Sequence, residues 1–207
     1  MKRLFAPAIL GLGALGLSGC VSLGAEVPDS LLTLSPTASA PIGAGAVAGS
    51  EGGPGAIAVM TPEVPAKLDV LRVPVDVNDT QIAYLPETFW VEKPARLFRR
   101  LLGETLRAEL AEDAGAGAVP LVLDNDDTPT LASLYLRGSL SELGYDAQTS
   151  SVVVRFDAIR SNSEGDIVTK RFEARESGIV ADAASVGPAL NRAANTVAAE
   201  VADWMTQ

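Results

Sequence analysis

The stretch "SSVVVRFDAIRSNSEGDIVTKRFEARES", residues 150–177, decides the fold. Large apolar side chains occupy every second position from Val152 to Ala158, which is the period of a strand with one buried face. Ser161–Asp166 is polar and contains a glycine, as hairpin loops do, and Ile167–Ser177 alternates again through Phe172. The stretch therefore predicts a long antiparallel hairpin with one face turned to a core.

The segments on either side extend this hairpin into an α+β fold. Leu131–Leu143 alternates like a third long strand, and Ser185–Met205 has apolar residues at helical spacing. Upstream, Pro94 opens a helix with an apolar stripe and a polar opposite face. Shorter apolar runs predict further strands at Ile57–Met60, Leu68–Val77, Gln81–Leu85 (ended by Pro86) and Val119–Leu123. We expect a mainly antiparallel sheet with two helices packed on one face.

Residues 1–20 have the pattern of a bacterial lipoprotein signal. Lys2 and Arg3 precede an apolar run, Leu4–Leu17, which at about 14 residues is too short for a membrane span of about 20. Leu17-Ser18-Gly19-Cys20 then forms a lipobox, in which small residues precede the cysteine that takes a diacylglycerol. The alternative is an ordinary secretory signal with a chance cysteine. We expect residues 1–19 to be removed and Cys20 to carry diacylglycerol and an N-acyl chain (such as palmitate), which hold the protein on a membrane.

The rest of the chain predicts a tether followed by one domain. Residues 20–55 are mostly Ala, Gly, Ser and Pro, which is typical of a flexible segment, although Leu31–Leu34 could be a first strand. Residues 56–207 are long enough to bury a core of their own. Val21 follows the cysteine where lipoproteins kept in the inner membrane often carry Asp. This favours the periplasmic leaflet of the outer membrane.

The composition argues against several classes of function. The 207-residue chain has a formal net charge of −10, one cysteine and no histidine. So acidic a chain is a poor ligand for nucleic acid, and the missing histidine removes the commonest general base and metal ligand. The acidic run at residues 124–127 lacks the glycine and the distant Glu of a calcium loop. We expect no enzyme activity, no metal and no cofactor beyond the acyl chains on Cys20.

The first helix carries a basic cluster of Arg96, Arg99 and Arg100. These side chains could solvate the helix and pair with Glu92 and Glu104, or they could form a docking surface for an acidic partner.

An aromatic group precedes that helix. Tyr84, Phe89 and Trp90 lie between Pro86 and Pro94. They could pack in the core or form an exposed contact for a partner, so they join the three arginines as candidate docking residues.

The chain resembles the ABC-type transport auxiliary lipoproteins, the PqiC-like family. The resemblance lies in the lipobox at Cys20 and in "VPAKLDVLRV" from Val64, "TQIAY" from Thr80 and "FWVEKPARLFRRLLGETLRAEL" from Phe89. It continues with "LYLRGSLSELGYD" from Leu134, which is followed by "VVVRFDAI" and a hairpin.

The resemblance implies an accessory role in lipid transport, with no catalytic residues. The implied partners are an ABC permease, its ATPase and a mammalian-cell-entry (MCE) domain protein. The tethered domain would dock on the MCE protein and bridge it to the outer membrane. Because such partners are usually ring-shaped, self-association as a homo-oligomer is plausible. A structural envelope lipoprotein without a transport role is the alternative that the residues alone leave open.

Overall fold

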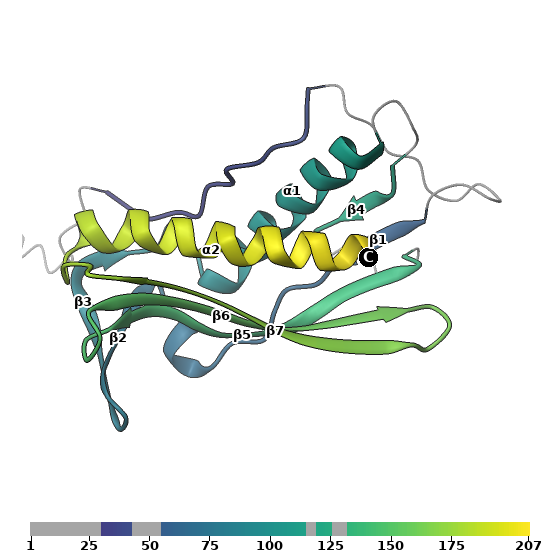
Figure 1. Ribbon diagram of the computed structural model, residues 1–207. Coiled ribbons are helices and arrows are strands. Elements are labelled where there is room, and N and C mark those ends of the chain that lie inside the picture. The colour runs from purple at the N-terminus through teal and green to yellow at the C-terminus, as the bar shows by residue number, and fades with distance from the viewer. Residues whose placement is uncertain (1–29, 43–54, 115–118, 126–131) are drawn as a thin grey trace, which may run out of the picture.

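The computed structural model describes residues 30–42, 55–114, 119–125 and 132–207 (Figure 1). Its strands are β1 (Ala56–Val59), β2 (Arg72–Asn78), β3 (Gln81–Phe89), β4 (Leu121–Leu123), β5 (Leu134–Asp146), β6 (Ser151–Asn162) and β7 (Ile167–Ser177). Its helices are α1 (Pro94–Ala114), α2 (Ala183–Thr206) and a 3-10 turn at Ala66–Leu68. The strands form one seven-stranded sheet, and both α-helices lie on one face of it. The predicted α+β class is confirmed.

The long strand β5 is the centre of the sheet. Along one edge it pairs with β6 over its whole length, antiparallel, and β6 pairs in the same way with β7. Along the other edge β1 and β2 lie end to end, both parallel to β5, with β1 at Leu134–Leu136 and β2 at Tyr145–Asp146. β4 pairs with β1 in parallel and β3 pairs with β2 as a hairpin. The sheet is thus mixed, with its long ladders antiparallel.

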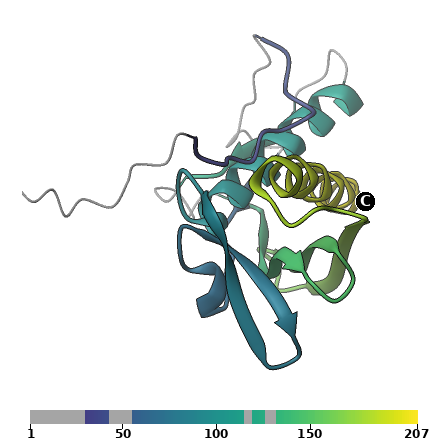
Figure 2. The same ribbon diagram turned by 90° about the vertical axis from the view of Figure 1, so that its left-hand side faces the viewer.

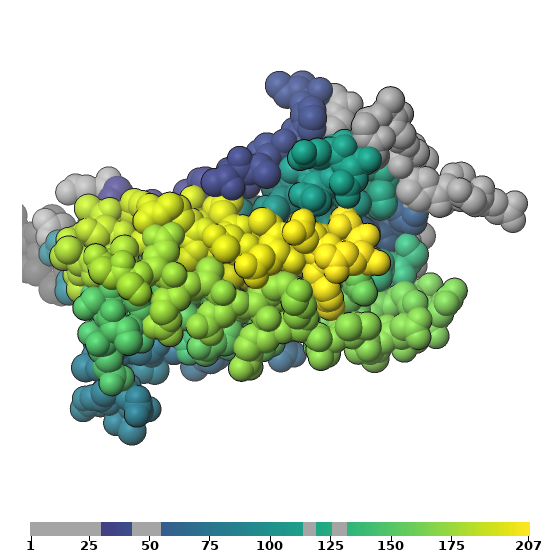
Figure 3. Space-filling model, viewed as in Figure 1, coloured from purple at the N-terminus to yellow at the C-terminus, as the bar shows by residue number. Residues whose placement is uncertain are grey.

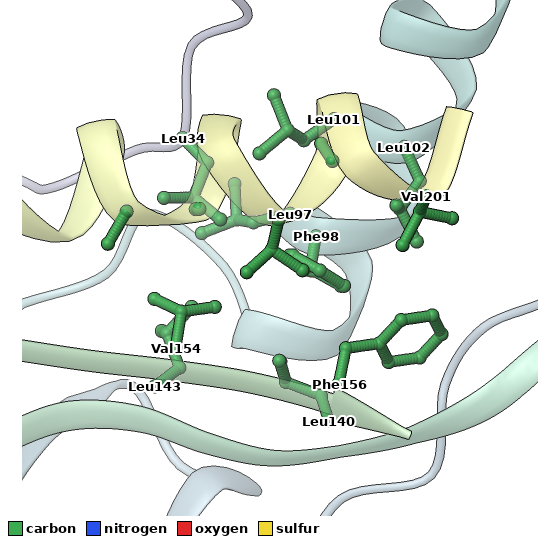
Figure 4. Close-up of a cluster of buried hydrophobic side chains, with 14 of the residues drawn as sticks. Leu34, Leu97, Phe98, Leu101, Leu102, Leu140, Leu143, Val154, Phe156 and Val201 are labelled. Atoms are coloured by element: carbon green, nitrogen blue, oxygen red, sulfur yellow. The ribbon is translucent and has the colours of Figure 1, made fainter. Parts of the chain in front are cut away.

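The core lies between the sheet and the two helices. Side chains of α1, such as Leu97 and Phe98, meet inward-facing residues of β5 and β6 (Figure 4). The Phe98 ring meets the Phe156 ring edge to face, with 5.3 Å between centroids. α2 begins at Asp182, whose carboxylate accepts a hydrogen bond from the Ser185 N–H at 2.8 Å, as an N-cap does. Each fully buried apolar side chain of this core, such as Leu97 or Phe98, stabilises the fold by about 1.5–3 kcal/mol.

β3 is longer than the sequence predicts. We expected it to end at Pro86, but it runs to Phe89. Pro86 is exposed on an edge strand, where its missing N–H removes no ladder hydrogen bond. The pairing with β2 shifts register near this point, and Glu87 takes a positive φ of 50°. The proline therefore marks an irregularity within the strand and not its end.

Part of the predicted flexible segment is packed on the domain. Residues 31–40, which we call the strap, begin at the end of β3: the Leu32 N–H donates to the Phe89 carbonyl at 2.7 Å, and the Val91 N–H donates to the Leu32 carbonyl at 2.8 Å. Leu34 is buried in the core, only 8% exposed. The prediction of a flexible segment is wrong here, and Leu31–Leu34 forms one bridge, Leu32 to Trp90, instead of a strand. The lipobox, Cys20 and residues 43–54 lie outside the described residues.

Two asparagines of α2 hold the polar half of the strap. The Asn191 Oδ1 accepts a hydrogen bond from the Ser35 N–H at 2.7 Å, and the Asn195 Oδ1 accepts one from the Thr37 N–H at 2.8 Å. The Asn195 amide also donates to the Ser35 carbonyl at 2.9 Å. Further along, the Ala40 N–H reaches Glu104 of α1 at 3.2 Å. The strap therefore follows α2 and then turns toward α1 (Figures 1, 2 and 3).

Candidate docking surface

The three arginines of the predicted basic cluster do not lie on one common surface. Arg96 and Arg100 are exposed, and both bind Glu92, with 3.3 Å between the Arg96 Nε and a Glu92 carboxylate oxygen. Arg99 is only 6% exposed and lies on the buried side of α1. The docking prediction is therefore wrong for Arg99, because a buried guanidinium cannot meet a partner. Arg96 and Arg100 fit the alternative of a solvated helix face paired with Glu92.

The aromatic group divides into one core residue and two surface residues. Trp90 is 1% exposed and belongs to the core, and its indole N–H has no hydrogen-bond partner among the described residues. Tyr84 and Phe89 are half-buried, and the Arg72 guanidinium lies 5.1 Å from the Tyr84 ring centroid and 5.9 Å from that of Phe89. Such cation–π contacts stabilise by about 0.5–1 kcal/mol at exposed sites. We call Arg72, Tyr84 and Phe89 the aromatic patch.

The aromatic patch lies on the β2–β3 hairpin, which projects beyond the rest of the sheet (Figures 1 and 2). Two apolar side chains near its tip are exposed, Ile82 at 51% and Val77 at 40%. Among the described strands β3 pairs with β2 alone, so its other edge is open up to Phe89, whose carbonyl accepts a hydrogen bond from the Leu32 N–H of the strap. Its first half, Gln81–Leu85, contains no charged residue.

The opposite edge of the sheet is protected against pairing. β7 carries five charged residues in its "KRFEARE" stretch, residues 170–176, and charges on an edge strand disfavour pairing with another chain. β3 has no such protection in its first half. Of these two edges, β3 is the one suited to meet a partner.

The face of the sheet opposite the helices carries a network of ion pairs at its β2 end. Lys67 joins two strands, with its Nζ 3.1 Å from Asp76 and 2.6 Å from Glu142. Burial lowers the pKa of Lys67, but the hydrogen bonds that its ammonium donates to both carboxylates outweigh this effect, so its pKa is raised above the usual value. Beside it, Arg155 binds Glu173 at 2.5 Å. These groups neutralise each other, which is a structural arrangement and not a catalytic one.

A metal centre and a membrane-crossing helix each place requirements on the residues that form them. In the described ranges, no three or more metal-ligating side chains converge. Within the same ranges, no helix combines the length and the apolar composition that crossing a membrane requires.

Comparisons with known proteins agree with the fold. The family model described as "ABC-type transport auxiliary lipoprotein component" matches residues 34–202. The crystal structure of a DUF330-family protein from Xanthomonas campestris is 16% identical, with a TM-score of 0.59 over 86% of this chain and 91% of that chain. That of an uncharacterized protein is 15% identical, with a TM-score of 0.58 over 72% and 89% of the two chains. At these identities the structures are similar in fold alone, and a search of curated proteins finds no match.

Proposed function

Because the chain belongs to the family of ABC-type transport auxiliary lipoproteins, whose role is accessory and not enzymatic, we propose that it serves a lipid transporter. In this proposal Cys20 tethers the protein to the periplasmic leaflet of the outer membrane. The folded domain docks on the MCE-domain protein of the transporter and bridges it to that membrane. Lipid then passes between the membranes without crossing free water.

The observation that carries the proposal is the aromatic patch on a projecting edge hairpin. Tyr and Arg are enriched among the residues that dominate binding energy at protein interfaces. Here Tyr84 and Arg72 are already stacked, so little side-chain freedom is lost when a partner covers them. The net charge of −10 disfavours an anionic lipid surface as the alternative occupant.

The strap supports the tethering half of the proposal. About a dozen residues separate Cys20 from Leu32, and a chain of that length can reach at most about 40 Å. Since Leu32 and Leu34 are fixed to the domain, the domain stays close to its membrane. The β2–β3 hairpin and the helix-free face of the sheet are left accessible.

Capture of the MCE protein by the full-length lipidated protein in detergent tests the proposal. Replacing Tyr84 and Phe89 together with Ala is expected to weaken capture by at least about 30-fold, which corresponds to the loss of one interface hot spot of about 2 kcal/mol. Val168→Ala is the matched control, because Val168 is an exposed apolar residue, at 44%, on β7 and not on this hairpin.

Two outcomes distinguish an error about the binding surface from an error about the partner. If the double variant binds like the wild type, the aromatic patch is not the binding surface. If the wild type captures no MCE protein, the docking role itself is wrong. The same assay tests the two exposed arginines. Arg96→Glu with Arg100→Glu, which leaves the buried Arg99 intact, is expected to weaken capture only if an acidic rim meets α1, and then in a salt-dependent way.

A further inference from the structure

The helix-free face of the sheet differs at its two ends. The β2 end holds the paired charges around Lys67, whereas the β1 end is apolar. There the segment after β1 runs beside β5, with the Met60 N–H donating to the Leu136 carbonyl and the Glu63 N–H to the Gly138 carbonyl, both at 2.9 Å. A groove of about 1010 Å³ lies between this segment and strands β5, β6 and β7.

The groove has apolar side chains that no helix covers. Met60 lines it from the segment after β1, Ile159 from β6 and Ile167 from β7. Ile159 is only partly buried, and Ile167 is 66% exposed. Apolar side chains that gather in one exposed groove are a feature of sites for an apolar ligand or partner. The volume is that of a small-molecule site, which typically measures about 300–1,000 Å³.

The groove is less acidic than the chain as a whole. Two basic residues, Arg137 and Arg171, line it together with two acidic ones, Glu63 and Asp157. Lys170 also borders it, but its side chain lies on the helix side of β7, with its Nζ 4.8 Å from the centroid of the buried Phe172 ring. The second groove on the helix-free face, around Lys67, has three basic residues against four acidic ones. Of the two grooves, the first is therefore the one that accommodates an anion better, although the protein is acidic overall.

Arg137 is the cation available to such an anion. Arg171 is already bound to Asp157 at 2.5 Å, as Arg155, Arg175 and Arg192 are bound to carboxylates elsewhere. Arg137 instead donates to the Ser161 hydroxyl at 2.8 Å, and within the described ranges no carboxylate lies within ion-pair distance of it. An exposed guanidinium held over an apolar groove presents its remaining N–H groups to a ligand.

We propose that this groove binds one molecule of an anionic amphiphile, with its apolar chain along Met60, Ile159 and Ile167 and its phosphate or carboxylate headgroup on Arg137. The identification of that amphiphile as a lipid in transit rests on the proposed transport function. The groove is separate from the aromatic patch, so the domain can hold the partner and the lipid at different places.

Photo-crosslinking in vesicles tests the proposal. The full-length lipidated protein, with a photo-reactive amino acid in place of Ile167, is anchored in phosphatidylcholine vesicles with and without phosphatidylglycerol. Irradiation followed by mass spectrometry of the labelled peptide then identifies the lipid attached. The matched control places the same amino acid at Ile82, which is also an exposed apolar residue of this face, at 51%, but lies at the other end.

We expect phosphatidylglycerol adducts at Ile167 above the level at Ile82. Arg137→Gln should lower them about 3- to 10-fold, the loss of one solvent-screened, charge-assisted hydrogen bond, while Arg137→Lys keeps most of them. Equal labelling at both positions, labelling with no preference for phosphatidylglycerol, or no effect of Arg137→Gln would each overturn the proposal. Because no MCE protein is present, the result is independent of the capture experiment.

Discussion

At the scale of single residues, the Asn195 side chain joins α2 to residues of the strap that lie 158 and 160 positions away in the sequence. Its Oδ1 accepts from the N–H and the hydroxyl of Thr37, and its amide donates to the carbonyls of Ser35 and Asn191. An Asn side chain offers two donors and two acceptor positions, so all of them are used. With Asn195 only 7% exposed, no water is needed to satisfy it.

Asn195→Ala is expected to loosen the strap. Losing this set of hydrogen bonds should lower the free energy of unfolding by about 1–3 kcal/mol, or the melting temperature by roughly 3–9 °C for a domain of this size. Hydrogen exchange at residues 35–40 should become faster while β5 and β6 keep their protection. Thr196→Ala, an exposed neighbour bonded only to its own helix, is the control and should change little. Unchanged exchange in the strap of Asn195→Ala would contradict this role.

Burial of individual residues could be predicted only in part from the sequence. The alternating positions of the 150–177 hairpin are buried as the pattern predicts, with Val152 and Val154 at 0%. Arg99 was placed on the wrong side because a helix face beside other arginines is usually solvated. Trp90 is buried partly because the strap pairs with it at Leu32. The strap in turn is held by α2 residues that lie 156 to 160 positions further along the chain. No local signal reports contacts at such a sequence separation.

At the scale of elements, the contact between α1 and α2 brings like charges together. Glu109 of α1 lies near Asp203 of α2 and near Asp113 and Glu112 of its own helix. Partial burial and these neighbouring carboxylates raise the pKa of Glu109 above its usual value. The raised pKa means that the folded protein favours the protonated form of Glu109 over the charged form. Its charged form therefore destabilises the helix pair at neutral pH, and the penalty disappears as the pH falls through its pKa.

Glu109→Gln should therefore stabilise the protein at pH 7. The gain is small because these groups are largely solvated: about 0–1 kcal/mol, or a rise in melting temperature of up to about 3 °C. Below about pH 4, where Glu is protonated like the neutral Gln, variant and wild type should melt together. Melting curves at pH 7 and pH 3.5 measure the difference. Destabilisation at pH 7 would show that the Glu109 carboxylate makes a favourable contact.

The strands illustrate how far a pattern predicts an element. The four-part order of short strands, a helix, long antiparallel strands and a helix is confirmed, since each element has its own periodicity and breakers. The extension of β3 through Pro86 was missed because the rule that proline ends a strand does not apply on an edge. That β1 and β2 share one edge of β5 follows from the length of β5, and a short apolar run does not reveal its pairing partner.

At the scale of the whole molecule, the strand-to-strand ion pairs make the fold sensitive to acid. A hydrogen bond from Thr149, followed by one from Arg175, lowers the pKa of Asp146, and Arg171 lowers that of Asp157 in the same way. A carboxyl group with a lowered pKa stabilises the fold above its usual value near 4 and loses this contribution as the pH falls through its lowered pKa.

The urea midpoint should therefore be nearly constant from pH 7 to about pH 5 and fall steadily below about pH 4. Asp157→Asn should flatten part of that fall, because one of the titrating groups is removed. Equilibrium unfolding followed by circular dichroism at several pH values measures both. A midpoint that is constant down to pH 2 would mean that these pairs do not contribute.

The strap has a mechanical consequence for an anchored protein. In the proposed tether, tension from Cys20 would first load the two backbone hydrogen bonds of Leu32, then the buried Leu34, then the bonds to Asn195 and last the bond from Ala40 to Glu104. Each contact that yields would lengthen the tether, by up to about 3.5 Å per residue and about 35 Å for the whole strap. The ladders that join β5, β6 and β7 lie outside this series of contacts. Under tension, release of the strap would thus lengthen the tether between the membrane and the domain before the long strands of the sheet are pulled apart.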